Sequence, residues 1–204
     1  MKKKKTSKNW IIRQNRDFFF KYSKVLEYRS RSAFKLIEIN DKFKILTKNT
    51  YLLDLGSNPG GWSQVASQKI KKGKILAVDI KQMKKIKNVN FLLGNFLTPF
   101  VKKEIETFFK QKIDVVISDM ASNTIGNKSL DSYKINELCM NAMEFAKLIL
   151  KNKGIFVSKF FMGSEFEEIK RKANGIFEKV VNFKPNSSKK ESREVYIIGK
   201  NIIN

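Results

Sequence analysis

Residues 51–62 read Tyr-Leu-Leu-Asp-Leu-Gly-Ser-Asn-Pro-Gly-Gly-Trp, an apolar run of strand length that passes into a glycine-rich turn. The residues that follow, 61–70, have the length and composition of a helix. Gly56, Gly60 and Gly61 allow the backbone to turn sharply and to approach a ligand closely before that helix begins. This stretch therefore predicts a strand, a ligand-binding turn and a helix in direct succession.

The same alternation of strand and helix continues to the end of the chain. The predicted strands cover residues 51–55, 74–79, 89–93, 113–119, 154–159, 177–183 and 194–198. The predicted helices between them cover residues 61–70, 99–110, 131–150 and 164–175. Nearly continuous apolar strands separated by helices are typical of a mostly parallel sheet that is covered on both faces. We therefore expect an α/β fold.

A length of 204 residues suits a single domain. We expect that domain to cover residues 30–204, with Ser32 as the N-cap of its first helix. Residues 1–29 are basic and aromatic, and they predict a loose arm that leads into a short helix. No apolar run approaches the roughly 18 residues that a membrane span requires, and charged residues interrupt any signal-peptide core. The sequence therefore predicts a cytoplasmic protein that does not enter the membrane.

The charge balance and the missing residue types exclude several kinds of chemistry. The chain holds 42 Lys and Arg against 19 Asp and Glu, a formal net charge of +23, with one Cys and no His. Internal disulfides, cysteine-rich zinc sites, histidine-ligated metals and Ser-His-Asp catalysis are thereby excluded, and no metal is expected. The positive charge favours a polyanion such as a nucleic acid as partner, although a general drift of composition towards lysine accounts for part of it.

Polar side chains stand where five of the predicted strands end. Ligands of parallel α/β sheets bind outside the carboxyl ends of the strands, so these positions are candidates for a functional site. One polar residue at a strand end is unremarkable, but several along one edge of one sheet are hard to explain by capping alone. The residues are Asp54, Asp79, Asn95, Asp119 and Lys159.

The glycine-rich turn favours S-adenosylmethionine as its ligand. Its spacing is not the Gly-x-Gly-x-x-Gly of nicotinamide dinucleotide sites, and no Lys-Ser/Thr pair follows the glycines as in a P-loop. Asp79, at the end of the second strand, is placed to accept hydrogen bonds from ribose hydroxyls. Asp54, just before the glycines, suits a ligand that carries an ammonium or a sulfonium. The alternative is a plain strand-to-helix turn that needs glycines for its shape.

Without histidine, a lysine is the natural base for removing a proton from a sugar hydroxyl. A lysine can do so only when burial or a neighbouring cation lowers its pKa. Lys159 ends an apolar strand, and Lys35 on an apolar helix could supply the neighbouring charge. Asp119 and Glu194 would orient the two lysines, provided that the last strand runs antiparallel to the others. Sequence spacing alone does not select these four residues.

The chain resembles the FtsJ/RrmJ (RlmE) family of ribosomal RNA 2′-O-ribose methyltransferases from about Trp10 onwards. Tyr-Arg-Ser-Arg-Ser-Ala-Phe-Lys-Leu at residues 28–36 is similar to the opening motif of the family, and residues 54–64 are similar to its cofactor loop. The remaining matches lie at residues 118–123, 159–161, 184–188 and 192–196. The resemblance implies a Rossmann-like class I methyltransferase fold, with a seven-stranded sheet in which one strand is antiparallel.

The resemblance also implies roles for individual residues. The catalytic tetrad of the family is carried here by Lys35, Asp119, Lys159 and Glu194. The expected S-adenosylmethionine contacts are Asp54, Gly56, Gly60, Gly61, Trp62, Asp79, Asn95 and Asp119. Two positions depart from the family pattern, since Asn95 replaces an aspartate and Ser122 replaces a proline. An Asn carbonyl still accepts a hydrogen bond, but without charge, so we expect weaker cofactor binding.

The implied substrate is a ribose 2′-OH of large-subunit (23S) ribosomal RNA, a uridine of the A loop in the assembled 50S subunit, with a role in ribosome maturation. We expect a monomer. The candidate phosphate contacts are Arg29, Arg31, Lys184, Lys189, Lys190 and Arg193, which could equally form a solvated surface. Two alternatives stay open: the same chemistry on tRNA or an mRNA cap, and a non-catalytic RNA-binding factor of ribosome assembly.

Overall fold

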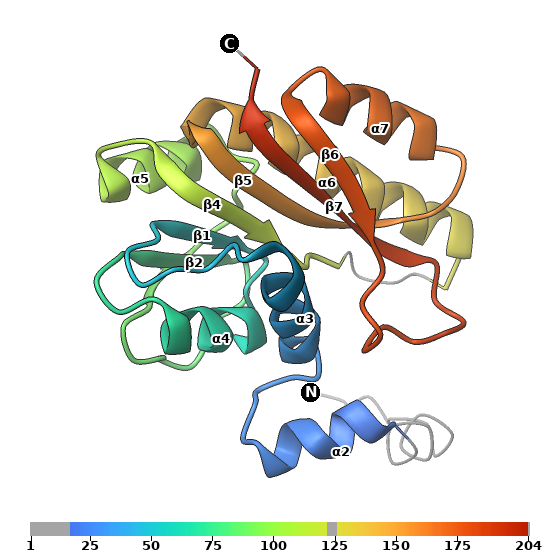
Figure 1. Cartoon of the computed structure of the whole chain (residues 1–204), viewed down its shortest axis with the longest axis horizontal. Helices are drawn as coiled ribbons and strands as arrows, with labels where there is room; N and C mark the ends of the chain where they lie inside the picture. The colour runs from blue at the N-terminus through green and yellow to red at the C-terminus, as the bar shows by residue number, and fades with distance from the viewer. Residues whose placement is uncertain (1–16, 122–125, 204) are drawn as a thin grey trace, which may run out of the picture.

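The computed structural model describes residues 17–121 and 126–203, and the predicted arm at residues 1–16 and the departure at Ser122 lie outside these ranges. The strands are β1 (Leu52–Leu55), β2 (Ile75–Asp79), β3 (Asn90–Leu93), β4 (Ile113–Ser118), β5 (Leu150–Phe161), β6 (Phe177–Phe183) and β7 (Glu194–Ile202). The helices are α2 (Phe18–Val25), α3 (Ala33–Phe43), α4 (Gly61–Lys69), α5 (Pro99–Phe109), α6 (Lys128–Ile149) and α7 (Phe166–Asn174) (Figure 1).

The seven strands form one sheet in the order β3-β2-β1-β4-β5-β7-β6. The pairs from β3 to β5 are parallel, and β7 is antiparallel to both of its neighbours, β5 and β6. The predicted fold with one antiparallel strand is confirmed. Because β7 runs in the opposite direction, its first residue, Glu194, lies opposite Phe161 at the end of β5. The carboxyl edge of the parallel strands and the start of β7 therefore coincide.

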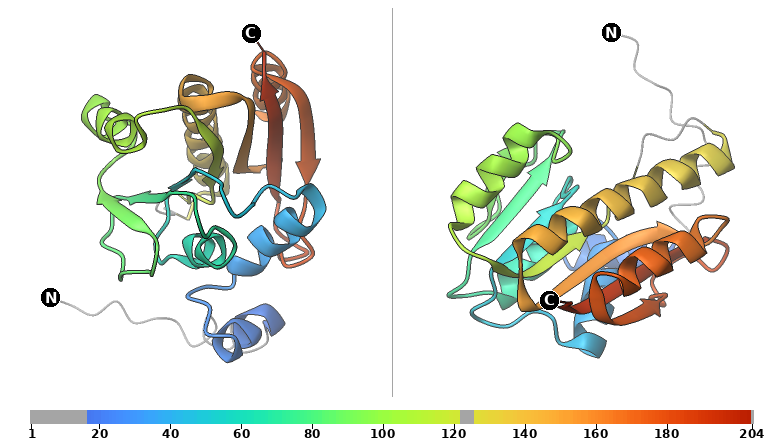
Figure 2. Two further views of the ribbon diagram at one scale, coloured as in Figure 1. Left: turned by 60° about the vertical axis from the view of Figure 1, so that its left-hand side comes forward. Right: turned by 90° about the horizontal axis from the view of Figure 1, so that it is seen from above.

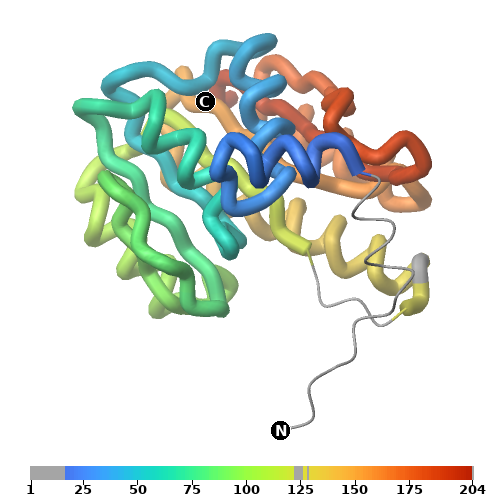
Figure 3. Tube along the Cα trace, turned by 90° about the horizontal axis from the view of Figure 1, so that it is seen from below, coloured from blue at the N-terminus to red at the C-terminus, as the bar shows by residue number. Residues whose placement is uncertain are grey.

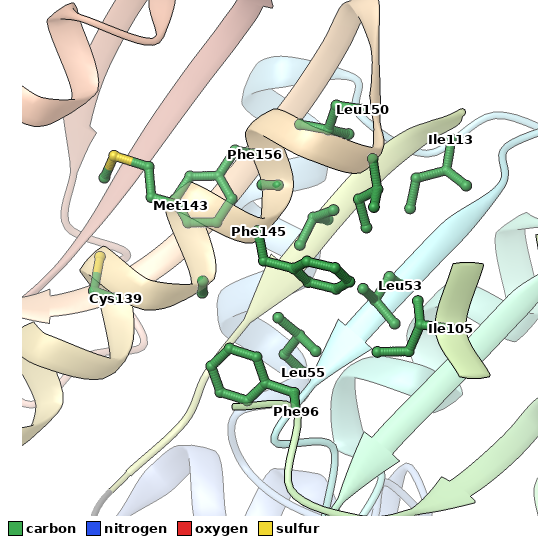
Figure 4. Packing of buried hydrophobic residues seen from close by; sticks show 14 of the residues in the cluster. Leu53, Leu55, Phe96, Ile105, Ile113, Cys139, Met143, Phe145, Leu150 and Phe156 are labelled. Carbon is green, nitrogen blue, oxygen red and sulfur yellow. The ribbon is translucent and has the colours of Figure 1, made fainter. Parts of the chain in front are cut away.

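Alternate residues along the strands face opposite helical layers. In β1, Leu53 and Leu55 belong to the core formed with α5, α6 and α7, whereas Leu52 packs with α3 and α4. The right-hand view of Figure 2 shows α5, α6 and α7 together on one side of the sheet. Phe145 of α6 lies in the middle of that core, beside Leu53 (Figure 4). Both faces of the sheet are therefore covered, as the apolar strands predict.

Three boundaries differ from the predicted ones because of pairing and capping. β5 begins at Leu150, which pairs with β4, and β7 continues to Ile202, which pairs with β6. α6 begins earlier than predicted because the Asn127 side chain accepts hydrogen bonds from the first turn. Ser32 is the N-cap of α3, as predicted, but its dihedral angles are helical (φ −64°, ψ −19°) and its side chain makes no capping hydrogen bond.

α2 lies outside the two layers, below α3 in Figure 1 and beside it in Figure 3. Asp17 caps α2 by accepting a hydrogen bond from the Phe20 N–H (3.1 Å). Within residues 17–121 and 126–203, no helix has the length and apolar character that crossing a membrane requires. In the same ranges, no three His, Cys, Asp or Glu side chains are grouped so as to hold a metal ion.

Candidate active site

A cleft of about 370 Å³ lies at the carboxyl ends of β1 to β4. Its wall consists of the last residues of β2 and the residues that follow these strands, together with Leu138 of α6. Four of the predicted cofactor contacts line it, together with apolar side chains. The residues that matter for the site are Gly56, Asp79, Asn95, Phe96, Asp119 and Met120.

Asp79 and Asn95 are held in place by backbone groups of their own loops. The Asp79 carboxylate accepts hydrogen bonds from the N–H groups of Asn58 (2.9 Å) and Lys81 (2.7 Å), one on each oxygen. The Asn95 side-chain oxygen accepts a hydrogen bond from the Leu97 N–H (3.1 Å). Each of these oxygens has a second lone pair, so both side chains remain able to accept hydrogen bonds from a ligand.

The glycine-rich turn needs glycine for two different reasons. Gly56 has φ +73°, and a Cβ at this position would lie 2.2 Å from Met120 Cγ, across the wall of the cleft. Gly60 has φ +110° and directly precedes α4, whose N-terminal N–H groups are suited to bind a carboxylate. Gly60, Gly61 and Trp62 do not belong to the wall of the cleft. Their predicted contribution to cofactor binding therefore rests on the backbone at the start of α4.

The indole of Trp62 has a structural position instead. It is 2% exposed, its Nε1 donates to the Ser32 carbonyl (2.8 Å), and its ring packs on Tyr196 with 5.5 Å between centroids. Trp62 thereby connects the start of α4 to α3 and to β7. The side chain that the sequence assigned to the cofactor thus holds together the elements that carry Lys35 and Glu194.

Asp54 does not line the cleft either. It is 1% exposed and accepts a hydrogen bond from Ser63 Oγ of α4 (2.6 Å). In β1 it shares the α3 and α4 face with Leu52, because alternate residues face the same side. Asp54 is therefore not part of the cleft wall, and its contact with the cofactor stays a prediction. Burial raises the pKa of Asp54 to about 7, although the hydrogen bond from Ser63 favours its charged form.

We expect Asp54→Asn to flatten the pH dependence of stability. Between the ordinary value of 3.8 and about 7, native Asp54 keeps a proton that the unfolded chain loses. The free energy of unfolding therefore falls as the pH rises through this range, by up to roughly 1.4 kcal/mol per pH unit. Urea unfolding at about pH 5 and about pH 7 measures this slope. Asp41→Asn, on the exposed end of α3, should keep the wild-type slope, and an unchanged slope in Asp54→Asn would contradict the assignment.

The four predicted catalytic residues come together at the edge of the cleft. Lys159 Nζ lies 3.1 Å from Asp119 Oδ1 and donates to the Asp119 backbone carbonyl (3.0 Å). Lys35 Nζ lies 2.7 Å from Glu194 Oε1 and 4.0 Å from Asp119 Oδ1. Lys35, Lys159 and Glu194 are each less than 10% exposed. Two lysines and two carboxylates therefore form one compact cluster with balanced charge.

Asp119 is the centre of this cluster. Burial opposes ionisation of its carboxyl, but the charges of Lys159 and Lys35 and a hydrogen bond from the Tyr196 hydroxyl (2.7 Å) outweigh it. The pKa of Asp119 is consequently lowered below its ordinary value. Asp119 also lines the cleft. Its negative charge therefore lies between the cofactor site and Lys159, in contact with both.

Two further residues belong to the cluster and were not among the predicted site residues. Tyr196 is fully buried, and burial together with the charges of Asp119 and Glu194 raises its pKa well above the ordinary value, so it stays a hydrogen-bond donor. Ser188 Oγ donates to Glu194 Oε1 (2.9 Å). Tyr196 lies two residues after Glu194 in β7, and this alternation would have placed both side chains on one face of the sheet. Ser188 carries no comparable signal, because it comes from a loop.

Most of the predicted phosphate contacts are engaged within the chain. Arg29 donates to the carbonyls of Lys84 (2.6 Å) and Lys85 (2.7 Å), next to the glycine-rich turn. Arg31 binds Asp17 and the Ser187 carbonyl. The other four residues lie in the loop between β6 and β7 and are exposed there: Lys184, Lys189, Lys190 and Arg193. Within that loop, Lys184 donates to the carbonyls of Lys190 (3.3 Å) and Ser192 (2.6 Å), and Arg193 donates to Ser132 Oγ (2.9 Å).

Comparison with known proteins identifies the family of the chain. Residues 28–202 match the family model of the FtsJ-like methyltransferases. The chain belongs to this family. Among named members, it is 47% identical to the ribosomal RNA large subunit methyltransferase E of Pelagibacter ubique, over 98% of both chains. It is 42% identical to the protein of the same name from Rickettsia bellii, over 98% of this chain and 91% of that one.

Solved structures extend the FtsJ-like assignment to the fold. A Plasmodium falciparum protein described as a ribosomal RNA methyltransferase superposes with a TM-score of 0.78 at 34% identity, covering 87% of this chain and all of that one. A Streptococcus mutans methyltransferase crystallised with SAH superposes with a TM-score of 0.54 at 15% identity, over 81% of this chain and 96% of that one. The second likeness concerns the fold alone.

Proposed function

We propose that this chain methylates a ribose 2′-OH of large-subunit ribosomal RNA, with S-adenosylmethionine as methyl donor. This proposal rests on two contacts of Asp119: it lines the cleft, and it also binds Lys159 Nζ. The methyl-donor site and the candidate base therefore meet at one residue. The names of the relatives support ribosomal RNA as the substrate.

The cleft fits the cofactor by volume and by chemistry. Its volume of about 370 Å³ is within the ordinary range for small-molecule sites. Asp79 offers a carboxylate to ribose hydroxyls, and Asn95 offers a carbonyl to the adenine amino group. Phe96 and Met120 supply apolar surface to the wall of the same cleft. S-adenosylmethionine bound there supplies an electrophilic methyl group.

Lys159 acts as the proton acceptor for the 2′-OH. As a neutral amine it has two N–H groups and one lone pair, and two acceptors of Asp119 are within reach: Oδ1 (3.1 Å) and the backbone carbonyl (3.0 Å). When both N–H groups are donated to these acceptors, the lone pair remains for the hydroxyl proton. As the proton moves to Nζ, the charge that develops on Lys159 is stabilised by the adjacent Asp119 carboxylate. Lys35 and Tyr196 fix that carboxylate from the other side.

The resemblance to the family supports finer proposals about the substrate and the enzyme. We take the target to be a uridine of the A loop in the assembled 50S subunit, modified during ribosome maturation, and the enzyme to be a cytoplasmic monomer. A 2′-OH is the feature that marks RNA, and a protein reaches it most readily where the nucleotide is unpaired.

Asn95→Asp should tighten S-adenosylmethionine binding by about 5- to 10-fold, because hydrogen bonds to an ionised acceptor are roughly twice as strong as neutral ones. The new carboxylate keeps the acceptor that the Leu97 N–H now uses. Isothermal titration with S-adenosylmethionine measures the change. Asn88→Asp adds the same charge outside the cleft and serves as control. Equal affinities for Asn95→Asp and wild type would remove Asn95 from the cofactor site.

Transfer of labelled methyl to three substrates tests the proposed function. The substrates are large ribosomal subunits that lack the modification, protein-free ribosomal RNA, and bulk tRNA. We expect label on the ribosomal subunits at a ribose 2′-oxygen. Label on tRNA alone would keep the chemistry and overturn the ribosomal substrate. Cofactor binding without transfer to any RNA would favour a non-catalytic RNA-binding factor.

A further inference from the structure

Three aromatic rings form a row that runs from the surface of α2 to α3. Phe18 and Tyr22 are stacked with 5.5 Å between ring centroids and 25° between planes. Tyr22 and Phe34 are stacked with 5.4 Å and 10°. Phe34 is buried, and Phe19 and Tyr28 contact its ring from other directions. The inner end of the row is therefore fixed in the protein.

The outer end of the row faces solvent. Phe18 is 68% exposed and Tyr22 is 41% exposed, although a large aromatic ring is usually covered in a folded protein. Residues 18–25 contain no acidic side chain, and both lysines of the helix, Lys21 and Lys24, are exposed. The surface around the outer ring thus combines an open π face with positive charge.

Arg31 fixes this surface to the rest of the candidate RNA face. Its guanidinium pairs with Asp17, the N-cap of α2, and also donates to the Ser187 carbonyl in the loop between β6 and β7. That loop also carries the exposed Lys189 and Lys190. Figure 3 shows the beginning of α2 next to this loop. Asp17 at the start of α2 is paired with Arg31, and in the loop the exposed Glu191 is outnumbered by exposed lysines, so the joined surface keeps a positive balance.

The row also leads to the reaction centre. Phe34 directly precedes Lys35 in α3, and Lys35 is paired with Glu194 in the catalytic cluster. The inner end of the row therefore lies on the helix that carries Lys35, next in the chain to a residue of the catalytic cluster. Aromatic rings in a positively charged setting are the usual means by which proteins hold unpaired bases.

We propose that the exposed face of Phe18 is a stacking site for an unpaired base of the RNA substrate, so that Phe18, Tyr22 and Phe34 hold a nucleotide flanking the methylated one. The inference rests on the proposed function for the identity of the RNA. The stacked geometry and the two lysines favour a base over an apolar protein segment as the occupant. A protein segment would use the whole apolar stripe of α2, which continues to Val25, and would not depend on a ring at residue 18.

Substitutions at residue 18 distinguish the two occupants. Phe18→Leu keeps apolar surface but removes the ring, whereas Phe18→Trp keeps and enlarges the ring. We expect Phe18→Leu to raise the KM for the RNA substrate roughly 10-fold, the size expected for the loss of one base stack, with kcat and cofactor affinity unchanged. Phe18→Trp should keep the wild-type KM for the RNA substrate. Val25→Ser, on the same face and 74% exposed, is the matched control and should match wild type.

A binding measurement separates this inference from the proposed function. In the full-length Phe18→Trp variant, a short single-stranded RNA should quench tryptophan fluorescence more than in wild type, and an RNA duplex of equal length should not. This readout needs no methyl transfer, so it stands even if the ribosomal substrate is wrong. Wild-type RNA affinity in Phe18→Leu, or equal losses in Phe18→Leu, Phe18→Trp and Val25→Ser, would overturn the stacking site.

Discussion

Lys159→Ala is expected to lower kcat for methyl transfer about 10³-fold while leaving S-adenosylmethionine affinity within about twofold of wild type. General-base catalysis contributes roughly 10²- to 10⁴-fold, and Lys159 Nζ is the group placed to accept the 2′-OH proton. The side chain does not line the cleft, so the cofactor loses no direct contact. Steady-state transfer of labelled methyl gives kcat, and isothermal titration gives the affinity.

A second lysine of β5 provides the control for Lys159→Ala. Lys151 lies near the other end of the strand, pairs with Asp114 at 2.6 Å and has a side chain that is 46% exposed. Lys151→Ala should keep the wild-type rate. If Lys159→Ala turned over at the wild-type rate with its cofactor bound, the assignment of the base would be wrong.

Asp119→Asn is expected to lower both activity and stability. It removes the charge that faces Lys159 at 3.1 Å and Lys35 at 4.0 Å, and it leaves two buried cations with one carboxylate, Glu194. Breaking a buried ion pair from one side costs roughly 3–5 kcal/mol, and we expect a loss of about 3 kcal/mol in the free energy of unfolding by urea denaturation. Turnover should fall about 10³-fold, because Lys159 loses its orienting charge.

The pH dependence and a double variant test the electrostatic origin of this loss. Because the pKa of Asp119 is lowered, its stabilising contribution is present above the ordinary carboxyl value and disappears as the pH falls through its native value. The stability difference between wild type and Asp119→Asn should therefore shrink in acid. Adding Lys159→Met to Asp119→Asn should recover part of the lost stability. Strict additivity of the two substitutions would contradict a coupled charge cluster.

The sequence allowed the functional edge of the sheet to be predicted, because that edge depends on strand ends, whereas the four members of the cluster were selected by the resemblance to the family. In a parallel sheet every strand ends at the same edge, so Asp79, Asn95 and Asp119 had to lie together once the strands were correctly placed. Glu194 joined them because β7 is antiparallel and starts at that edge. The pairing of Lys35 with Glu194 was not predictable from spacing, and it was implied only by the resemblance to the family.

The contacts that some predicted site residues make within the chain could not be read from the sequence. Asp54 stands at a strand end like Asp79, but the residue alternation of β1 turns its carboxylate towards Ser63. Arg29 and Arg31 are in the matching motif, but they bind backbone carbonyls and Asp17 rather than projecting into solvent. The sequence shows which residues are charged but not which groups they bind. The internal contacts of these residues are therefore known only from the structure.

The most direct test of the account is the chemical identity of the methylated nucleoside. Large ribosomal subunits that lack the modification are incubated with the enzyme and S-adenosylmethionine, and their RNA is digested to nucleosides for mass spectrometry. We expect a 2′-O-methylated nucleoside from the wild-type enzyme and at most a trace of it from Lys159→Ala. A nucleoside methylated on its base, or equal product from the Lys159→Ala enzyme, would contradict it.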